Sequence, residues 1–172
     1  IIQFTMYEID TWDNEYFSVF VNDSLLVHEQ MKGWEITGES ANGNFGSVHE
    51  DKHYYTLKAT VDFNGQVKLG FGSNLNSGIS DESWGIDDIK ITSEETFEKL
   101  LVSETFENRS ISGWSHNTLT QTNTELGKFL GRFGGTSGNQ GVYKTYNFGL
   151  QNVGEVVEIE FDMYEIDSWD NE

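Results

Sequence analysis

The 172-residue chain contains no cysteine and no proline. Without cysteine it cannot form a disulfide framework, a zinc–thiolate site or a cysteine nucleophile. This lack does not by itself place the chain in the cytosol. The absence of proline is unusual for a chain with many loops, and the sequence offers no physical explanation for it.

Basic residues are scarce. Ten Lys and Arg stand against 29 Asp and Glu, which gives a formal net charge of −19. Nucleic-acid binding needs clustered cations, and anionic lipid would repel this surface, so both partners are disfavoured. No apolar run approaches the roughly 18 residues that a membrane span needs. The acidity is typical of high solubility, cation binding or an extracellular setting.

Aromatic residues make up 14% of the chain, enough for a sandwich-sized core. Apolar and polar residues alternate over 157–164 and 55–63, which predicts strands with one buried face. Asn64-Gly65 predicts a tight hairpin, and Ser93–Leu101 is the best candidate for a turn of helix. We therefore predict an all-β fold, a two-sheet antiparallel β-sandwich of the jelly-roll type.

One twelve-residue motif occurs twice. Residues 4–15 recur as residues 161–172, differ only at the second and eighth positions, and lie 157 residues apart. The leading interpretation is a tandem array with a period of 157 residues. Two alternatives stay open: the copies flank one domain as a strand-exchange device, or the chain is a small protein with a duplicated edge strand.

The array interpretation predicts a fold that is permuted relative to the natural repeat boundary. Residues 1–92 would form the C-terminal part of one jelly-roll repeat, and residues 93–100 an acidic connector. Residues 101–172 would form the N-terminal part of the next repeat. The natural unit would begin at Leu101.

Two segments carry a resemblance to a known family. Trp84-Gly85-Ile86-Asp87-Asp88-Ile89 looks like the closing strand of concanavalin-like and MAM-like jelly rolls, and Phe106-Glu107 with Gly113-Trp114 resembles their opening strand. The combination is similar to repeats of very large secreted surface proteins. The resemblance implies a jelly roll in which carboxylates near the closing strand hold a calcium ion.

The acidic residues of the repeated motif predict the same ion independently, because Ca²⁺ takes six to eight oxygen ligands. The first copy supplies Glu8, Asp10, Asp13 and Glu15, and the second supplies Glu165, Asp167 and Asp170. The segment before and within the predicted closing strand would complete the site with Asp81, Glu82, Asp87 and Asp88. The alternative is a solvated acidic loop.

Other chemistry is less well supported by the sequence. The carboxylates of residues 8–13 superficially resemble the Glu-x-Asp-x-x-Glu pattern of jelly-roll glycosidases. The last position is Asp13, however, and a repeated module without a cleft favours metal binding, so we expect no enzyme. Exposed aromatic residues could form a sugar-stacking platform, although core packing is favoured; the candidates are Trp12, Trp34, Trp114, Tyr54 and Tyr143. Asn22 and Asn108 begin N-glycosylation sequons, of which Asn108 is the favoured one.

The leading functional prediction is a structural repeat of an extracellular filament or giant cell-surface adhesin, rigidified by calcium. Its partners would be neighbouring copies of the same repeat, assembled end to end, and its location secreted or at the cell surface. The alternative is a carbohydrate-binding module of a secreted protein, with glycans as partners.

Overall fold

A computed structural model describes most of the chain. It covers residues 2–9, 13–32, 39–41, 50–76, 78–79, 83–94, 99–124, 126–134 and 141–166. Within these ranges the side chains of 2–9, 13, 14, 32, 39–41, 50, 51, 165 and 166 are not described.

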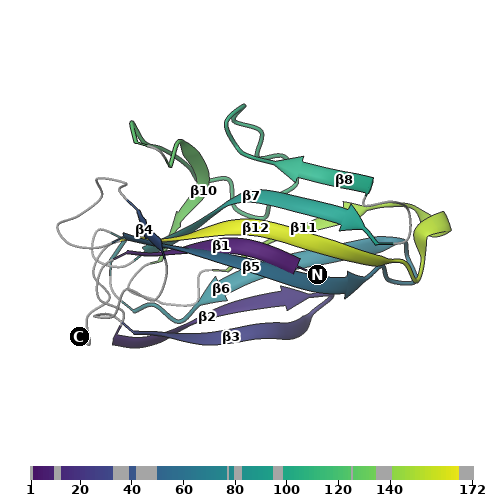
Figure 1. The fold of residues 1–172 in the computed structure, drawn as a ribbon, viewed down its shortest axis with the longest axis horizontal. Coiled ribbons are helices and arrows are strands. Elements are labelled where there is room, and N and C mark those ends of the chain that lie inside the picture. The colour runs from purple at the N-terminus through teal and green to yellow at the C-terminus, as the bar shows by residue number, and fades with distance from the viewer. Residues whose placement is uncertain are drawn as a thin grey trace.

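The strands form two sheets that pack face to face (Figure 1). The four-stranded sheet has the order β11-β6-β2-β3, with β2 Asp13–Val21, β3 Ser24–Lys32, β6 Gln66–Ser73 and β11 Gly141–Asn147. The eight-stranded sheet has the order β4-β5-β1-β12-β7-β10-β9, and β8 pairs with β7 outside this path. Its strands are β1 Ile2–Ile9, β4 Glu39–Ala41, β5 Glu50–Thr60, β7 Ser83–Ser93, β8 Lys99–Glu104, β9 Leu119–Gln121, β10 Lys128–Phe133 and β12 Val156–Ile166.

Period-two alternation explains how each sheet covers the core. Along β6 every second residue is buried, so Val67, Leu69 and Phe71 face the other sheet. Phe17 and Val19 of β2 do the same from the neighbouring strand. The prediction of an all-β, two-sheet sandwich is confirmed.

One local prediction is wrong, and another is tested only in part. Asn64-Gly65 lies in a tight turn in which Gly65 N–H donates to the Asp62 carbonyl, but this turn joins β5 and β6, which belong to different sheets. The helical turn predicted over Ser93–Leu101 falls partly outside the described residues, which omit 95–98; at its described ends Ser93 ends β7 and Lys99 begins β8, its antiparallel neighbour.

Helical structure is minimal. The described residues contain one 3-10 turn, η1 Leu150–Asn152, and no helix long and apolar enough to cross a membrane.

The two copies of the motif lie side by side. β1 and β12 pair in parallel, with Thr5 opposite Asp162 and Tyr7 opposite Tyr164. This pairing departs from the predicted antiparallel arrangement, because two copies of one segment run here in the same direction and register. Strands of residues 1–92 and of residues 101–172 share both sheets through the pairs β6–β11 and β7–β12. The natural repeat boundary stays a prediction.

Candidate functional site

A groove of about 640 Å³ runs over the outer face of the four-stranded sheet. This face is opposite the core, and its residues come from the positions that β2, β3, β6 and β11 turn outward. The groove lies across all four strands of the sheet, and it opens to solvent. Its main lining residues are Tyr16, Ser18, Phe20, His28, Lys68, Gly70, Gly72 and Tyr143.

Two glycines form the floor. Gly70 lies opposite Phe20 of β2 and Tyr143 of β11, whereas Gly72 lies opposite Ser18 and Gly141. Neither glycine is demanded by space, since an added Cβ on Gly70 would meet its nearest atom at 3.6 Å and one on Gly72 at 3.9 Å. Glycine inside a strand weakens the strand and often marks a place where a ligand approaches the backbone.

Aromatic rings line the two sides. Tyr143 is 52% exposed and Phe20 38% exposed, on either side of Gly70. Tyr16 of β2 and His28 of β3 stack with their ring centroids 4.3 Å apart and their planes 7° from parallel. The stack presents a second flat surface beside the trough. A sheet face of this shape can hold a flat, partly apolar ligand.

Polar groups accompany the rings. Ser18 Oγ and His28 Nδ1 lie 3.0 Å apart in a hydrogen bond. Lys68 Nζ donates to Asp23 Oδ1 at 2.6 Å and lies 5.1 Å from the centre of the Tyr143 ring. This hydrogen bond raises the pKa of Lys68. Because the lysine and the aspartate neutralise one another, the charged end of the groove has no net charge of its own.

The predicted calcium ligands fall in three groups. Asp10, Asp81, Glu82, Asp167 and Asp170 lie outside the described residues. The backbone of Glu8, Asp13 and Glu165 is described, at the ends of β1, β2 and β12, but their side chains are not. The side chains of Glu15, Asp87 and Asp88 are described, and within the described part of the chain no three His, Asp or Glu side chains gather into a metal-binding group. The calcium prediction therefore stays untested.

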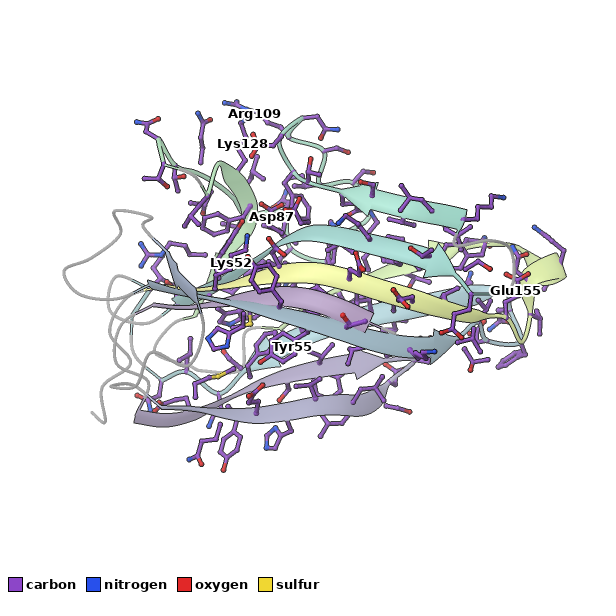
Figure 2. The ribbon with its side chains drawn as sticks, in the orientation of Figure 1. Lys52, Tyr55, Asp87, Arg109, Lys128 and Glu155 are labelled. Atoms are coloured by element: carbon purple, nitrogen blue, oxygen red, sulfur yellow. The ribbon has the colours of Figure 1, made fainter. Side chains whose placement is uncertain are left out.

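Asp87 is the most perturbed of these carboxylates. It is 5% exposed on β7, next to Asp162 of β12. Burial, and to a lesser extent the charges of Asp88 and Asp162, raise the pKa of Asp87 to about 9. Hydrogen bonds from Asp88 N–H and Tyr164 Oη lower it. Asp162 in turn pairs with Lys52 at 2.9 Å, and Figure 2 shows Lys52 and Asp87 near one another along this sheet.

Sequence reasoning identified one residue of the groove. Of the proposed aromatic platform, Tyr143 lines the groove, while Tyr54 lies on the other sheet, in β5. Trp114 is 7% exposed and packs against Phe106, as core packing predicts. Trp12 and Trp34 lie outside the described residues. The signal that was missed is the alternation of Lys68, Gly70 and Gly72, which places both glycines on one face of a strand.

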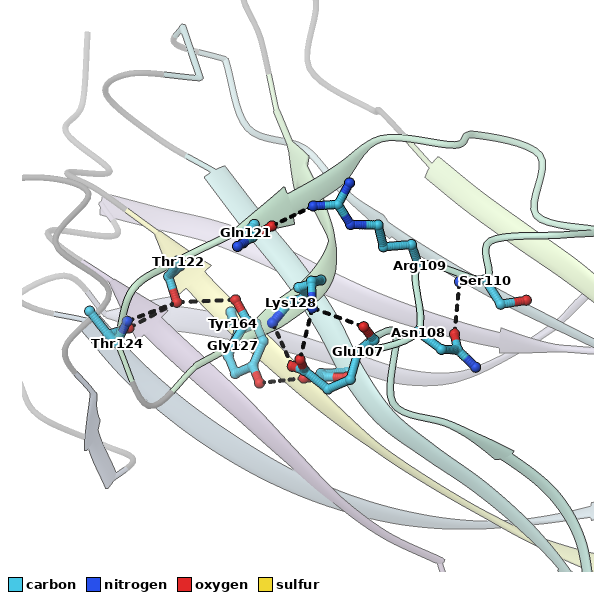
Figure 3. Close-up of polar contacts among 11 residues, drawn as sticks. Glu107, Asn108, Arg109, Ser110, Gln121, Thr122, Thr124, Gly127, Lys128 and Tyr164 are labelled. Carbon is cyan, nitrogen blue, oxygen red and sulfur yellow. Dashed lines mark hydrogen bonds and ion pairs between the residues drawn. The ribbon is translucent and has the colours of Figure 1, made fainter.

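The two sequons occupy different environments. Asn22 begins the two-residue β2–β3 turn with φ 50°, and its amide donates to the Thr60 carbonyl and accepts from Lys68 N–H. Asn108 is exposed, and its Oδ1 accepts a hydrogen bond from Ser110 N–H at 2.8 Å (Figure 3). Only Asn108 presents its amide without disturbing contacts that join strands.

Comparisons of the chain with protein-family models, with curated proteins and with solved structures return no match.

Proposed function

We propose that this β-sandwich is a carbohydrate-binding module whose ligand lies in the groove of the four-stranded sheet. The observation that carries the proposal is the pair of glycines on β6, which open a trough between exposed aromatic rings. The sequence ranks this function second, behind a calcium-rigidified structural repeat. The geometry favours it, because it rests on side chains that the structure brings together.

The chemistry of the groove matches a pyranose ring. A sugar presents apolar C–H faces, which pack on aromatic rings, and hydroxyl edges, which exchange hydrogen bonds with polar side chains. Tyr143 and the Tyr16–His28 stack supply the flat surfaces. Ser18 and His28 supply groups that donate and accept.

The charges of the groove and of the whole chain favour an uncharged glycan as the ligand. The Lys68 ammonium is paired with Asp23, and the chain as a whole carries a net charge of −19. The negative charge of the chain would repel a polyanionic glycan. Among the described groove residues no unpaired cation offsets this repulsion.

The test is a panel of neutral and acidic polysaccharides, followed by calorimetry with the best binder. Tyr143→Ala should weaken binding about tenfold, which corresponds to roughly 1.4 kcal/mol. Tyr54→Ala is the matched control, because Tyr54 is 58% exposed and Tyr143 52% exposed, but on opposite sheets. Equal losses in the two variants, or binding of acidic glycans alone, would contradict the proposal.

A further inference from the structure

The place of β12 in the eight-stranded sheet depends on a small set of apolar side chains. β12 pairs antiparallel with β7 from Val157 to Ile166. Its core-facing residues Val157, Ile159, Phe161 and Met163 are fully buried, and Tyr164 is 2% exposed. These side chains make β12 the central strand of the sheet.

β1 has the residues needed for the same place. Shifting the sequence by 157 residues aligns Ile2 with Ile159, Phe4 with Phe161, Met6 with Met163 and Tyr7 with Tyr164, and each pair is identical. Because four of the five buried side chains would be the same, β1 could fill most of the position of β12 with little change in packed volume; Val157 alone has no counterpart in β1.

The pairing partners overlap as well. In the sheet, β5 pairs antiparallel with β1 and also with β12. Tyr55 of β5 lies opposite Phe4 of β1 and opposite Phe161 of β12, which are equivalent residues of the two copies. One position on β5 therefore accepts either copy in the same register.

The main difference between the two copies over the aligned residues is charge. Glu160 pairs with Lys90 at 3.4 Å, and Asp162 pairs with Lys52 at 2.9 Å. The equivalent residues of β1 are Gln3 and Thr5, which carry no charge. β12 thus keeps its place through two ion pairs and the buried Val157, whereas the rest of the apolar packing is the same in both copies.

We propose that the β12 position is an exchangeable binding site for the β1 segment of a second copy of this chain. In the exchanged state β1 of one copy pairs with β7 of another in place of β12, and the two sandwiches are linked by a shared sheet. The proposal is independent of glycan binding, since the groove lies on the other sheet.

The test uses the full chain and a fluorescent peptide of residues 1–12 as the probe. The variant Glu160→Gln/Asp162→Thr removes both ion pairs from β12, so it should bind the peptide about fivefold more tightly than the unchanged chain. Light scattering should show a concentration-dependent dimer of this variant that the peptide dissociates. A peptide with Phe4→Asp is the control and should not bind.

A reciprocal experiment covers the case in which the double variant does not fold. The peptide carrying Gln3→Glu and Thr5→Asp acquires the carboxylates of β12 and should bind the unchanged chain about fivefold better than the original peptide. A chain that stays monomeric at every concentration and binds neither peptide would overturn the proposal. Equal binding of the Phe4→Asp peptide would overturn it too.

Discussion

Each sheet has a glycine on its outer face, but the two glycines differ in what lies over them. On the eight-stranded sheet, a Cβ added to Gly85 would meet Phe129 Cδ2 at 2.3 Å. Phe129 is fully buried and packs edge-on against Tyr164, with ring centroids 4.6 Å apart. On the four-stranded sheet, a Cβ on Gly70 would meet nothing closer than 3.6 Å.

This difference separates a structural glycine from a candidate functional one. Gly85 lacks a side chain because a ring of the same protein occupies that space. Gly70 and Gly72 have only ordinary clearances above them, so the fold does not explain their identity. The comparison suggests that a ring from outside the chain takes the place over β6 that Phe129 takes over β7.

Substitution of Gly85 is expected to change the stability of the fold the most. Gly85→Ala should lower the free energy of unfolding by about 2 to 3 kcal/mol, because the new methyl group displaces the buried Phe129 ring. Urea denaturation of the variant and of the unchanged chain measures the difference. An effect no larger than that of Gly70→Ala would remove the distinction between the two glycines.

The next prediction concerns the calcium ion that the acidic residues are expected to bind. If the predicted carboxylates bind the ion, calcium at a hundredfold its dissociation constant should stabilise the fold by about 2.7 kcal/mol. Melting in calcium and in chelator measures this, and Asp10→Ala should reduce the difference. The same melting temperature in both solutions would argue against the site.

The buried carboxyl of Asp87, on β7 of the eight-stranded sheet, should make the stability of the fold depend on pH. Its folded-state pKa of about 9 exceeds the ordinary 3.8, so its contribution to stability is complete below pH 4 and is lost as pH rises toward 9. Asp87→Asn mimics the protonated carboxyl, so the variant should be more stable than the unchanged chain at pH 8 and no more stable at pH 4. Unfolding measured in chelator at both pH values checks this, and an unchanged pH slope would contradict it.

Alanine substitutions at the two sequon asparagines can be compared directly. Asn22→Ala should destabilise the fold by about 1 to 2 kcal/mol, because it removes both hydrogen bonds to Thr60 and Lys68 and places alanine at positive φ. Asn108→Ala should change stability little. In a eukaryotic secretory host, Asn108→Ala should also remove the only glycan at these two sites, as mass spectrometry would show. A glycan on Asn22 of the folded protein would contradict this assignment.

The sequence predicted the sandwich because alternation is a local signal with a direct spatial meaning. Along 66–73, for example, every second residue enters the core as the pattern requires. It could not predict which sheet each strand joins, so Asn64-Gly65 suggested a hairpin where the chain crosses between sheets. Nor could it predict the groove, whose rings come from β2, β3 and β11 and meet only through long-range pairing.

Substitution of Gly70 is expected to change stability the least, and it tests the contrast between Gly70 and Gly85 most directly. Gly70→Ala should raise the free energy of unfolding by about 0.5 to 1 kcal/mol, since alanine is favoured over glycine inside a strand and its methyl group has room. The same variant should weaken glycan binding, because the methyl group fills the trough between Tyr143 and Phe20. A gain in stability together with a loss of binding distinguishes a glycine kept for a ligand from one kept for the fold. A loss of stability would instead place Gly70 in the same class as Gly85.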